Sequence, residues 1–83
     1  MANEVDLQEW VRDCLRDRGG ETSIVDVCRW IWNRHEGELR NSGDLFFTWQ
    51  YDVRWAADAL RRKGVLRQAN ESPRGIWRLR EGR

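Results

Sequence analysis

Several residue types that mark particular classes of protein are scarce in this sequence of 83 residues. It has one proline, one histidine and two cysteines, and Cys14 and Cys28 do not form a C-x-x-C pair. We therefore expect neither a disulfide framework nor a Cys/His zinc site, and the low proline content does not suit a disordered chain. Both cysteines fall on apolar faces of predicted helices, where they are expected as small buried side chains.

Targeting and membrane signals are also missing. No apolar run approaches ~18 residues, and the N-terminus has no basic segment followed by an apolar one. We therefore expect no membrane span and no secretory signal, and we predict a cytoplasmic protein.

The usual catalytic arrangements are absent as well. The sequence shows no paired-carboxylate motif, no Ser/His/Asp motif and no glycine-rich phosphate-binding motif. The single histidine, His35, has no evident nucleophile or carboxylate to work with, and we expect it to cap the C-terminus of a helix. The sequence predicts no enzymatic activity, no metal, no cofactor and no small-molecule substrate.

Six tryptophans and an uneven distribution of charge are the main positive features. Each tryptophan can bury on the order of 150–250 Å², which suits one core, so we expect a single domain over 1–83. Residues 1–47 carry six Arg against ten Asp and Glu, a net charge of −4. Residues 48–83 carry nine Lys and Arg against four acidic residues, a net charge of +5. Such a basic half is typical of a surface that faces an anion, although a solvated basic surface would have the same composition.

Two amphipathic helices are predicted in the first half of the chain. Over 7–18 the apolar residues recur at i, i+3, i+4, i+7 and i+8, with Asp6 as the expected N-cap. A second helix is expected over 24–35, with Ser23 as its N-cap. Residues 21–22 between them are predicted to form a short extended connector.

A loop and a third helix are predicted next. Residues 36–47 contain two glycines and an Asn-Ser-Gly turn, which favours a loop whose apolar residues 45–47 return to the core. The third helix is expected over 49–63, with Thr48 or Asp44 as its N-cap.

Residues 65–80 are predicted to form a hairpin. Segments 65–68 and 76–80 have β character and flank a run of turn-forming residues, and Trp77 and Leu79 are expected to face inward. The order is then helix, extended link, helix, loop, helix and hairpin. We therefore predict a mainly α fold with a small β-hairpin, namely a winged helix-turn-helix of three helices plus a C-terminal two-stranded wing.

A motif in the second half resembles a known family. It consists of Arg54-Trp55-Ala56, Leu60, Gly64-Val65-Leu66, Arg74-Gly75-Ile76-Trp77-Arg78-Leu79 and Gly82. This pattern resembles the winged-helix domain at the N-terminus of Mrr-type restriction proteins. Over the first 47 residues the agreement is in layout only. The resemblance implies a DNA-recognition module, usually joined to a nuclease domain, with a role in restriction or regulation.

The third helix of a winged helix commonly enters the major groove of DNA. Gln50 and Arg54 lie one turn apart on the exposed face, where Gln can pair with adenine and Arg with guanine. Tyr51, Arg61 and Arg62 are suited to phosphate contacts. For Gln50 and Tyr51 the alternative is an ordinary surface position.

The hairpin adds further candidate contacts to double-stranded DNA. Arg74 at its tip and Arg78 on its second strand are predicted to bind phosphates or the minor groove, or else to form a solvated edge protected by charge. Asp58 on the third helix is unfavourable near phosphate. It could hold Arg54 at i+4, or the face could bind protein instead.

A protein-interaction role without direct DNA binding is the alternative prediction. Trp30 points away from the apolar stripe of the second helix, so we expect it to be exposed, and exposed tryptophans are enriched at contact sites. Trp30 would then mark a dimer interface or the binding site of a partner protein.

Overall fold

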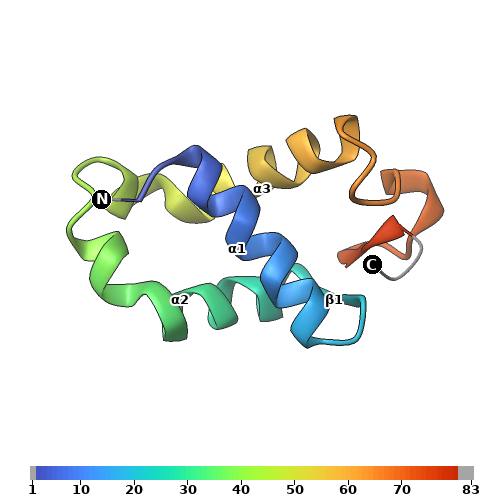
Figure 1. Ribbon diagram of the computed structural model, residues 1–83, viewed down its shortest axis with the longest axis horizontal. Coiled ribbons are helices and arrows are strands. Elements are labelled where there is room, and N and C mark those ends of the chain that lie inside the picture. The colour runs from blue at the N-terminus through green and yellow to red at the C-terminus, as the bar shows by residue number, and fades with distance from the viewer. Residues whose placement is uncertain (1, 81–83) are drawn as a thin grey trace.

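Three helices form most of the molecule, which a computed structural model describes over residues 2–80. The elements in chain order are α1 (Glu4–Asp17), β1 (Glu21–Ser23), α2 (Ile24–Arg40), α3 (Leu45–Arg62), the 3₁₀ turn η1 (Ala69–Glu71) and β2 (Ile76–Arg78). In Figure 1, α1 lies across α2 and α3, and the strands lie at the end of the molecule opposite the N-terminus. The prediction of a mainly helical fold with a small antiparallel sheet is confirmed at this level. No helix in this part of the chain is long and apolar enough to cross a membrane.

α1 begins earlier than predicted because its cap is Asn3 and not Asp6. The Asn3 side chain accepts a hydrogen bond from the Asp6 N–H at 3.0 Å, and the Asp6 carboxylate accepts one from the Asn3 N–H at 3.1 Å. This reciprocal pair is a capping box, in which Asp6 occupies the third helical position. The predicted cap of α2 is confirmed, since the Ser23 hydroxyl accepts a hydrogen bond from the Asp26 N–H at 3.1 Å.

The predicted loop over 36–47 is wrong. α2 continues to Arg40 through a break at His35, whose φ of −127° and ψ of 21° are not helical. The His35 ring stacks on Trp10 of α1, with centroids 3.8 Å apart and planes 9° apart, and its Nδ1 lies 2.7 Å from the Glu38 carboxylate. His35 therefore joins α1 to α2 in mid-helix and does not cap a helix end as predicted. Beyond the break, Leu39 is fully buried and anchors the last turns.

α3 also begins earlier than predicted, at Leu45. Asp44 holds the N-cap position but makes no capping hydrogen bond with its side chain, and Thr48 lies inside the helix. Of the three residues 45–47 expected in the core, Leu45 and Phe46 are partly buried, whereas Phe47 is 83% exposed. An early helix start explains this, because Phe47 falls one turn before exposed Tyr51 and so shares its solvent side.

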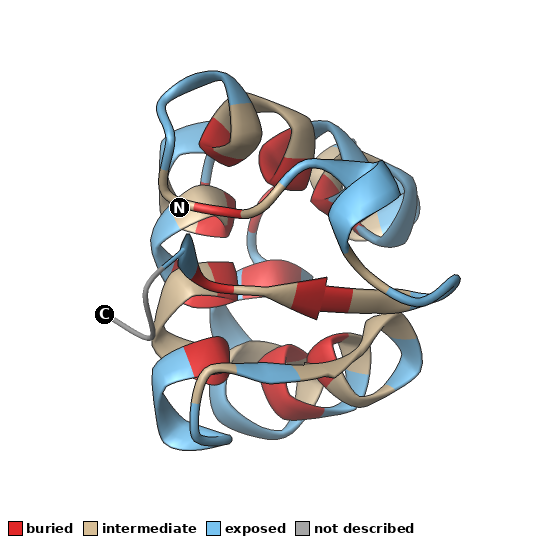
Figure 2. Ribbon diagram, turned by 90° about the vertical axis from the view of Figure 1, so that its right-hand side faces the viewer, coloured by how far each residue is buried: buried red, intermediate tan, exposed pale blue. Residues whose placement is uncertain are grey.

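The core lies between the three helices and β2. Trp10, Trp49 and Trp77 are all buried as predicted. Figure 2 shows the buried residues on the inner sides of the helices and in the middle of the strand. Cys14 is fully buried, and this burial raises the pKa of its thiol to about 12. Cys28 is partly buried, and desolvation raises the pKa of its thiol as well.

β2 pairs mainly with β1 and only weakly with the predicted first hairpin strand. The register of β1 and β2 places Thr22 opposite Trp77. In the segment predicted as strand 65–68, Leu66 forms a single bridge with Leu79, and the chain then turns into η1. Trp77 and Leu79 face the core as predicted. The hairpin is therefore shorter than predicted, and β1 supplies much of its support.

Candidate nucleic-acid interface

α3 presents a polar face beside a groove formed with α2. The buried side of the helix consists of Trp49, Val53, Ala56, Ala57 and Leu60. Gln50, Tyr51 and Arg54 are exposed, as predicted, and all three line the groove between α2 and α3. One turn of helix separates Gln50 from Arg54, so both can contact one elongated ligand that lies along α3.

Residues of α2 line the other side of this groove, and the sequence analysis did not select them. Val25 is 60% exposed and Arg29 is exposed, and both line the groove. Arg54 lies near enough to Cys28 for its charge to lower the pKa of that thiol, against the larger opposing effect of burial. Arg29 and Arg54 thus place positive charge on opposite sides of the groove. The signal for Arg29 was its position off the apolar stripe of the second predicted helix.

Asp58 holds Arg61 and not Arg54. The Arg61 Nη1 lies 2.8 Å from the Asp58 carboxylate, and the Arg61 Nε donates a hydrogen bond to the carbonyl of Arg67 at 3.4 Å. The Arg61 side chain is only 18% exposed, so its contacts tie α3 to the segment that follows. Of the alternatives considered for Asp58, the ion pair with Arg54 does not form between the described residues. Because Arg61 compensates the charge of Asp58, this carboxylate repels a phosphate less strongly than expected from the sequence.

The C-terminal segment, residues 65–80, adds a second groove next to the first. Arg74 is exposed in the turn before β2, and this groove is also lined by Arg54 and Arg61. The Ile24 N–H donates a hydrogen bond to the carbonyl of Gly75 at 3.0 Å, which fixes the turn against the start of α2. Because Arg54 lines both grooves, the surface runs without interruption from α2 across α3 to the turn.

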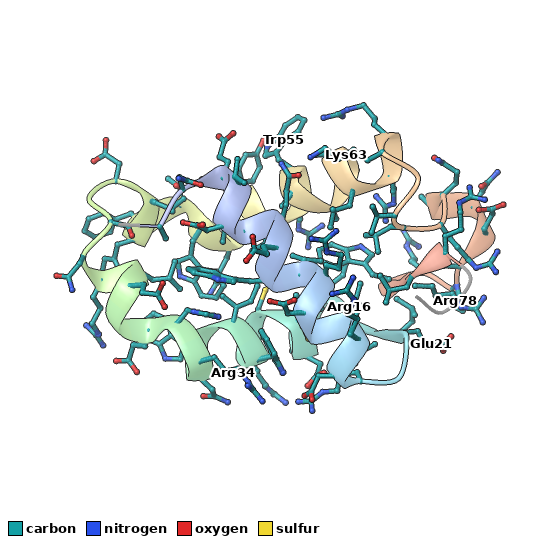
Figure 3. All side chains as sticks on the ribbon, in the orientation of Figure 1. Arg16, Glu21, Arg34, Trp55, Lys63 and Arg78 are labelled. Carbon is teal, nitrogen blue, oxygen red and sulfur yellow. The ribbon has the colours of Figure 1, made fainter. Side chains whose placement is uncertain are left out.

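Arg78 is placed differently from Arg74. Its Nε lies 2.7 Å from the Glu21 carboxylate across the sheet, and its Nη1 donates a hydrogen bond to the carbonyl of Glu71. Figure 3 shows Arg78 and Glu21 together at the strand end of the molecule. Arg78 therefore holds β1 and β2 together, and its charge is compensated.

The side of α3 that faces α1 carries Arg62, Lys63 and Trp55. Arg62 is exposed, as predicted, and Lys63 donates a hydrogen bond to the Gln8 side chain at 2.7 Å. Trp55 is 54% exposed and contacts Tyr51 edge to face, with ring centroids 6.0 Å apart. In Figure 3, Trp55 and Lys63 lie along the outer edge of α3.

The expected exposure of Trp30 is wrong. Trp30 is only 7% exposed, its Nε1–H donates a hydrogen bond to the Asp17 carboxylate at 3.0 Å, and the Arg34 guanidinium lies 4.5 Å from the ring centroid. It occupies the edge of the α2 stripe that faces α1, where the contact between the two helices covers it. The protein-interaction role predicted for Trp30 depended on its exposure and loses that support.

Comparison with known proteins gives no match. No family model matches the chain, and no curated protein or solved structure is significantly similar to it. The resemblance to the Mrr N-terminal domain stays a prediction, and Gly82 of its motif lies outside the described residues.

Proposed function

We propose that this protein is a winged helix-turn-helix module that binds double-stranded DNA. α3 would enter the major groove, and the C-terminal segment would serve as the wing. The observation that carries this proposal is the continuous surface on which Arg54 joins the α2–α3 groove to the groove beside Arg74. The order of helices and strands is compatible with a winged helix, and the motif that resembles Mrr-type proteins falls on the same elements.

The exposed residues of this surface divide between base contacts and phosphate contacts. Gln50 and Arg54 stand on the groove side of α3, where a glutamine suits adenine and an arginine suits guanine. Arg29 and Arg74 flank them on the start of α2 and on the turn, in positions suited to the two DNA strands. Arg62 lies further along α3 and suits a phosphate.

Two of the seven residues first selected take a structural part in this proposal. Arg61 and Arg78 each pair with a carboxylate, so we assign them to holding the wing in place and not to neutralising phosphate. Arg29 is added as a phosphate contact. The role we propose is recognition, without catalysis by this chain.

Titration of the protein into a fluorescently labelled mixed-sequence duplex tests the proposal. At low salt we expect binding tighter than about 100 μM, and a logarithm of the association constant that falls linearly with the logarithm of salt concentration, because bound arginines release counterions. Binding weaker than that limit, or binding that salt does not affect, would contradict the proposal.

A further inference from the structure

An exposed row of aromatic side chains runs along α3. Phe47, Tyr51 and Trp55 follow one another at intervals of four residues and are 83%, 63% and 54% exposed. We call these three residues the aromatic ridge. Within residues 2–80 they are the aromatic side chains of which more than half is exposed. Burying these rings against a partner would remove a large apolar area from water and so favour binding to a partner with apolar groups.

Two exposed arginines of α3 lie near the ridge together with two carboxylates of the same helix. Asp58 pairs with Arg61, whereas Asp52 accepts a hydrogen bond from the neutral Thr48 hydroxyl at 2.8 Å and keeps its charge. Arg54 and Arg62 are exposed on the same helix and form no ion pair with any residue from 2 to 80. The face therefore combines aromatic rings with two arginines that form no ion pair within the described part of the chain and with the single charged carboxylate of Asp52. It fits a polyanion that also offers apolar groups.

The major groove of DNA offers one apolar group on its base edges, which is the C5-methyl group of thymine. The phenyl ring of Phe47 has no donor or acceptor, and the Tyr51 hydroxyl lies only at the tip of its ring, so a ring face directed at the groove floor gains most from that methyl. Gln50 lies beside Tyr51 and is suited to adenine, the partner base of thymine. Residues four apart on a helix are separated by about 6 Å along its axis, which is close to two base-pair steps of about 3.4 Å.

We propose that Phe47 and Tyr51 of the aromatic ridge read the methyl groups of thymines about two base pairs apart, and so select duplexes that contain A·T pairs. Trp55 supports Tyr51 through its edge-to-face contact. This inference rests on the proposed binding of duplex DNA and adds the class of sequence that the site takes.

Replacing thymine by uracil tests the inference on the unaltered protein, because uracil lacks the methyl group and keeps every hydrogen-bonding group. Three duplexes of equal length serve as probes: alternating dA-dT, alternating dA-dU and alternating dG-dC. We expect the dA-dT duplex to bind most tightly, with about a fourfold loss of affinity for each methyl that is contacted and removed.

Variants then connect the methyl effect to the ridge. Phe47→Ala and Tyr51→Ala should each weaken binding to the dA-dT duplex and reduce its advantage over the dA-dU duplex. Val5→Ala provides a matched control, since Val5 is an exposed apolar residue on α1 at 66% exposure, and it should leave both affinities unchanged. Tyr51→Phe keeps the ring and should keep the preference for dA-dT.

The outcomes separate the two proposals. Equal affinity for dA-dT and dA-dU duplexes, with clear binding to both, overturns the thymine inference and leaves the proposed function standing. Absence of binding to all three duplexes overturns the proposed function and the inference with it. Tighter binding to an unpaired strand, or self-association of the protein that Phe47→Ala abolishes, would assign the ridge to another partner and also overturn the inference.

Discussion

Arg74 offers the most direct connection between one side chain and the way in which salt weakens DNA binding. It is exposed in the turn before β2, and no ion pair between described residues involves it. Removing it should therefore take away one phosphate contact and leave the fold intact. Arg78, four residues further, would be a poor choice because it also holds Glu21 across the sheet.

The size of the effect follows from the number of phosphates neutralised. If Arg29, Arg62 and Arg74 each neutralise one phosphate, the slope of log K against log salt should be about −2.7, because each contact contributes about −0.9. Between about 50 and 200 mM salt the affinity of the unaltered protein should then fall about 40-fold. For Arg74→Ala the slope should be about −1.8, which corresponds to a fall of about 12-fold over the same range.

Fluorescence anisotropy of a labelled duplex across a salt series measures this slope. Arg16→Ala is the matched control, since Arg16 is an exposed arginine on α1 (Figure 3) and lines neither of the two grooves. Both variants change the net charge equally. An unchanged slope for Arg74→Ala, or the same change for both variants, would refute the assignment of Arg74 to a phosphate.

Three further predictions concern stability. Trp30→Ala should lower the free energy of unfolding, measured by urea denaturation, by about 3–5 kcal/mol, because the variant leaves a cavity at a buried site. An unchanged free energy of unfolding would contradict the placement of Trp30 between α1 and α2. Hydrogen bonds from Arg18 and Thr22 hold the pKa of Asp26 below its usual range. The stability that the Asp26 carboxylate adds should therefore be fully present above the pKa of Asp26 in the unfolded chain. It should be lost as the pH falls through the lower pKa of Asp26 in the folded protein. Thermal unfolding of Asp26→Asn and the unaltered protein across acidic pH should therefore converge at low pH, and a constant difference would refute the linkage. Gly64 has a φ of +79° and open space where a Cβ would lie. Gly64→Ala should therefore lower the free energy of unfolding by about 1–2 kcal/mol through backbone strain alone. Equal melting temperatures for the variant and the unaltered protein would contradict this.

The sequence predicted those parts of the fold that depend on local patterns. Apolar residues at helical spacing identified all three helices, and Ser23 identified the start of α2. Inward-facing Trp77 and Leu79 followed from alternation along a strand. In each case the information lies within a few residues of the element itself.

The errors arose where contacts distant in the sequence decide the structure. α2 passes through His35 because the imidazole stacks on Trp10 of another helix, which no local pattern reveals. Trp30 is covered because α1 supplies Asp17 as an acceptor for its indole N–H.

The same limit applies to the candidate site. Exposure of Gln50, Tyr51 and Arg54 was predictable from their positions on one helix face. The pairing of Arg78 with Glu21 was not, because 57 residues separate them in the sequence. The continuity of the two grooves depends on how α2, α3 and the turn before β2 pack together.

Mapping of NMR chemical shifts during titration with a mixed-sequence duplex at low salt tests the proposed DNA interface most directly. We expect amide signals to shift along the exposed face of α3, around Gln50 and Arg54, and in the turn around Arg74. The indole N–H signal of exposed Trp55 should shift, whereas that of Trp30, which is buried against α1, should stay in place. Shifts confined to the α1–α2 surface around Trp30, or no shifts at a duplex concentration of about 100 μM, would contradict the proposed interface.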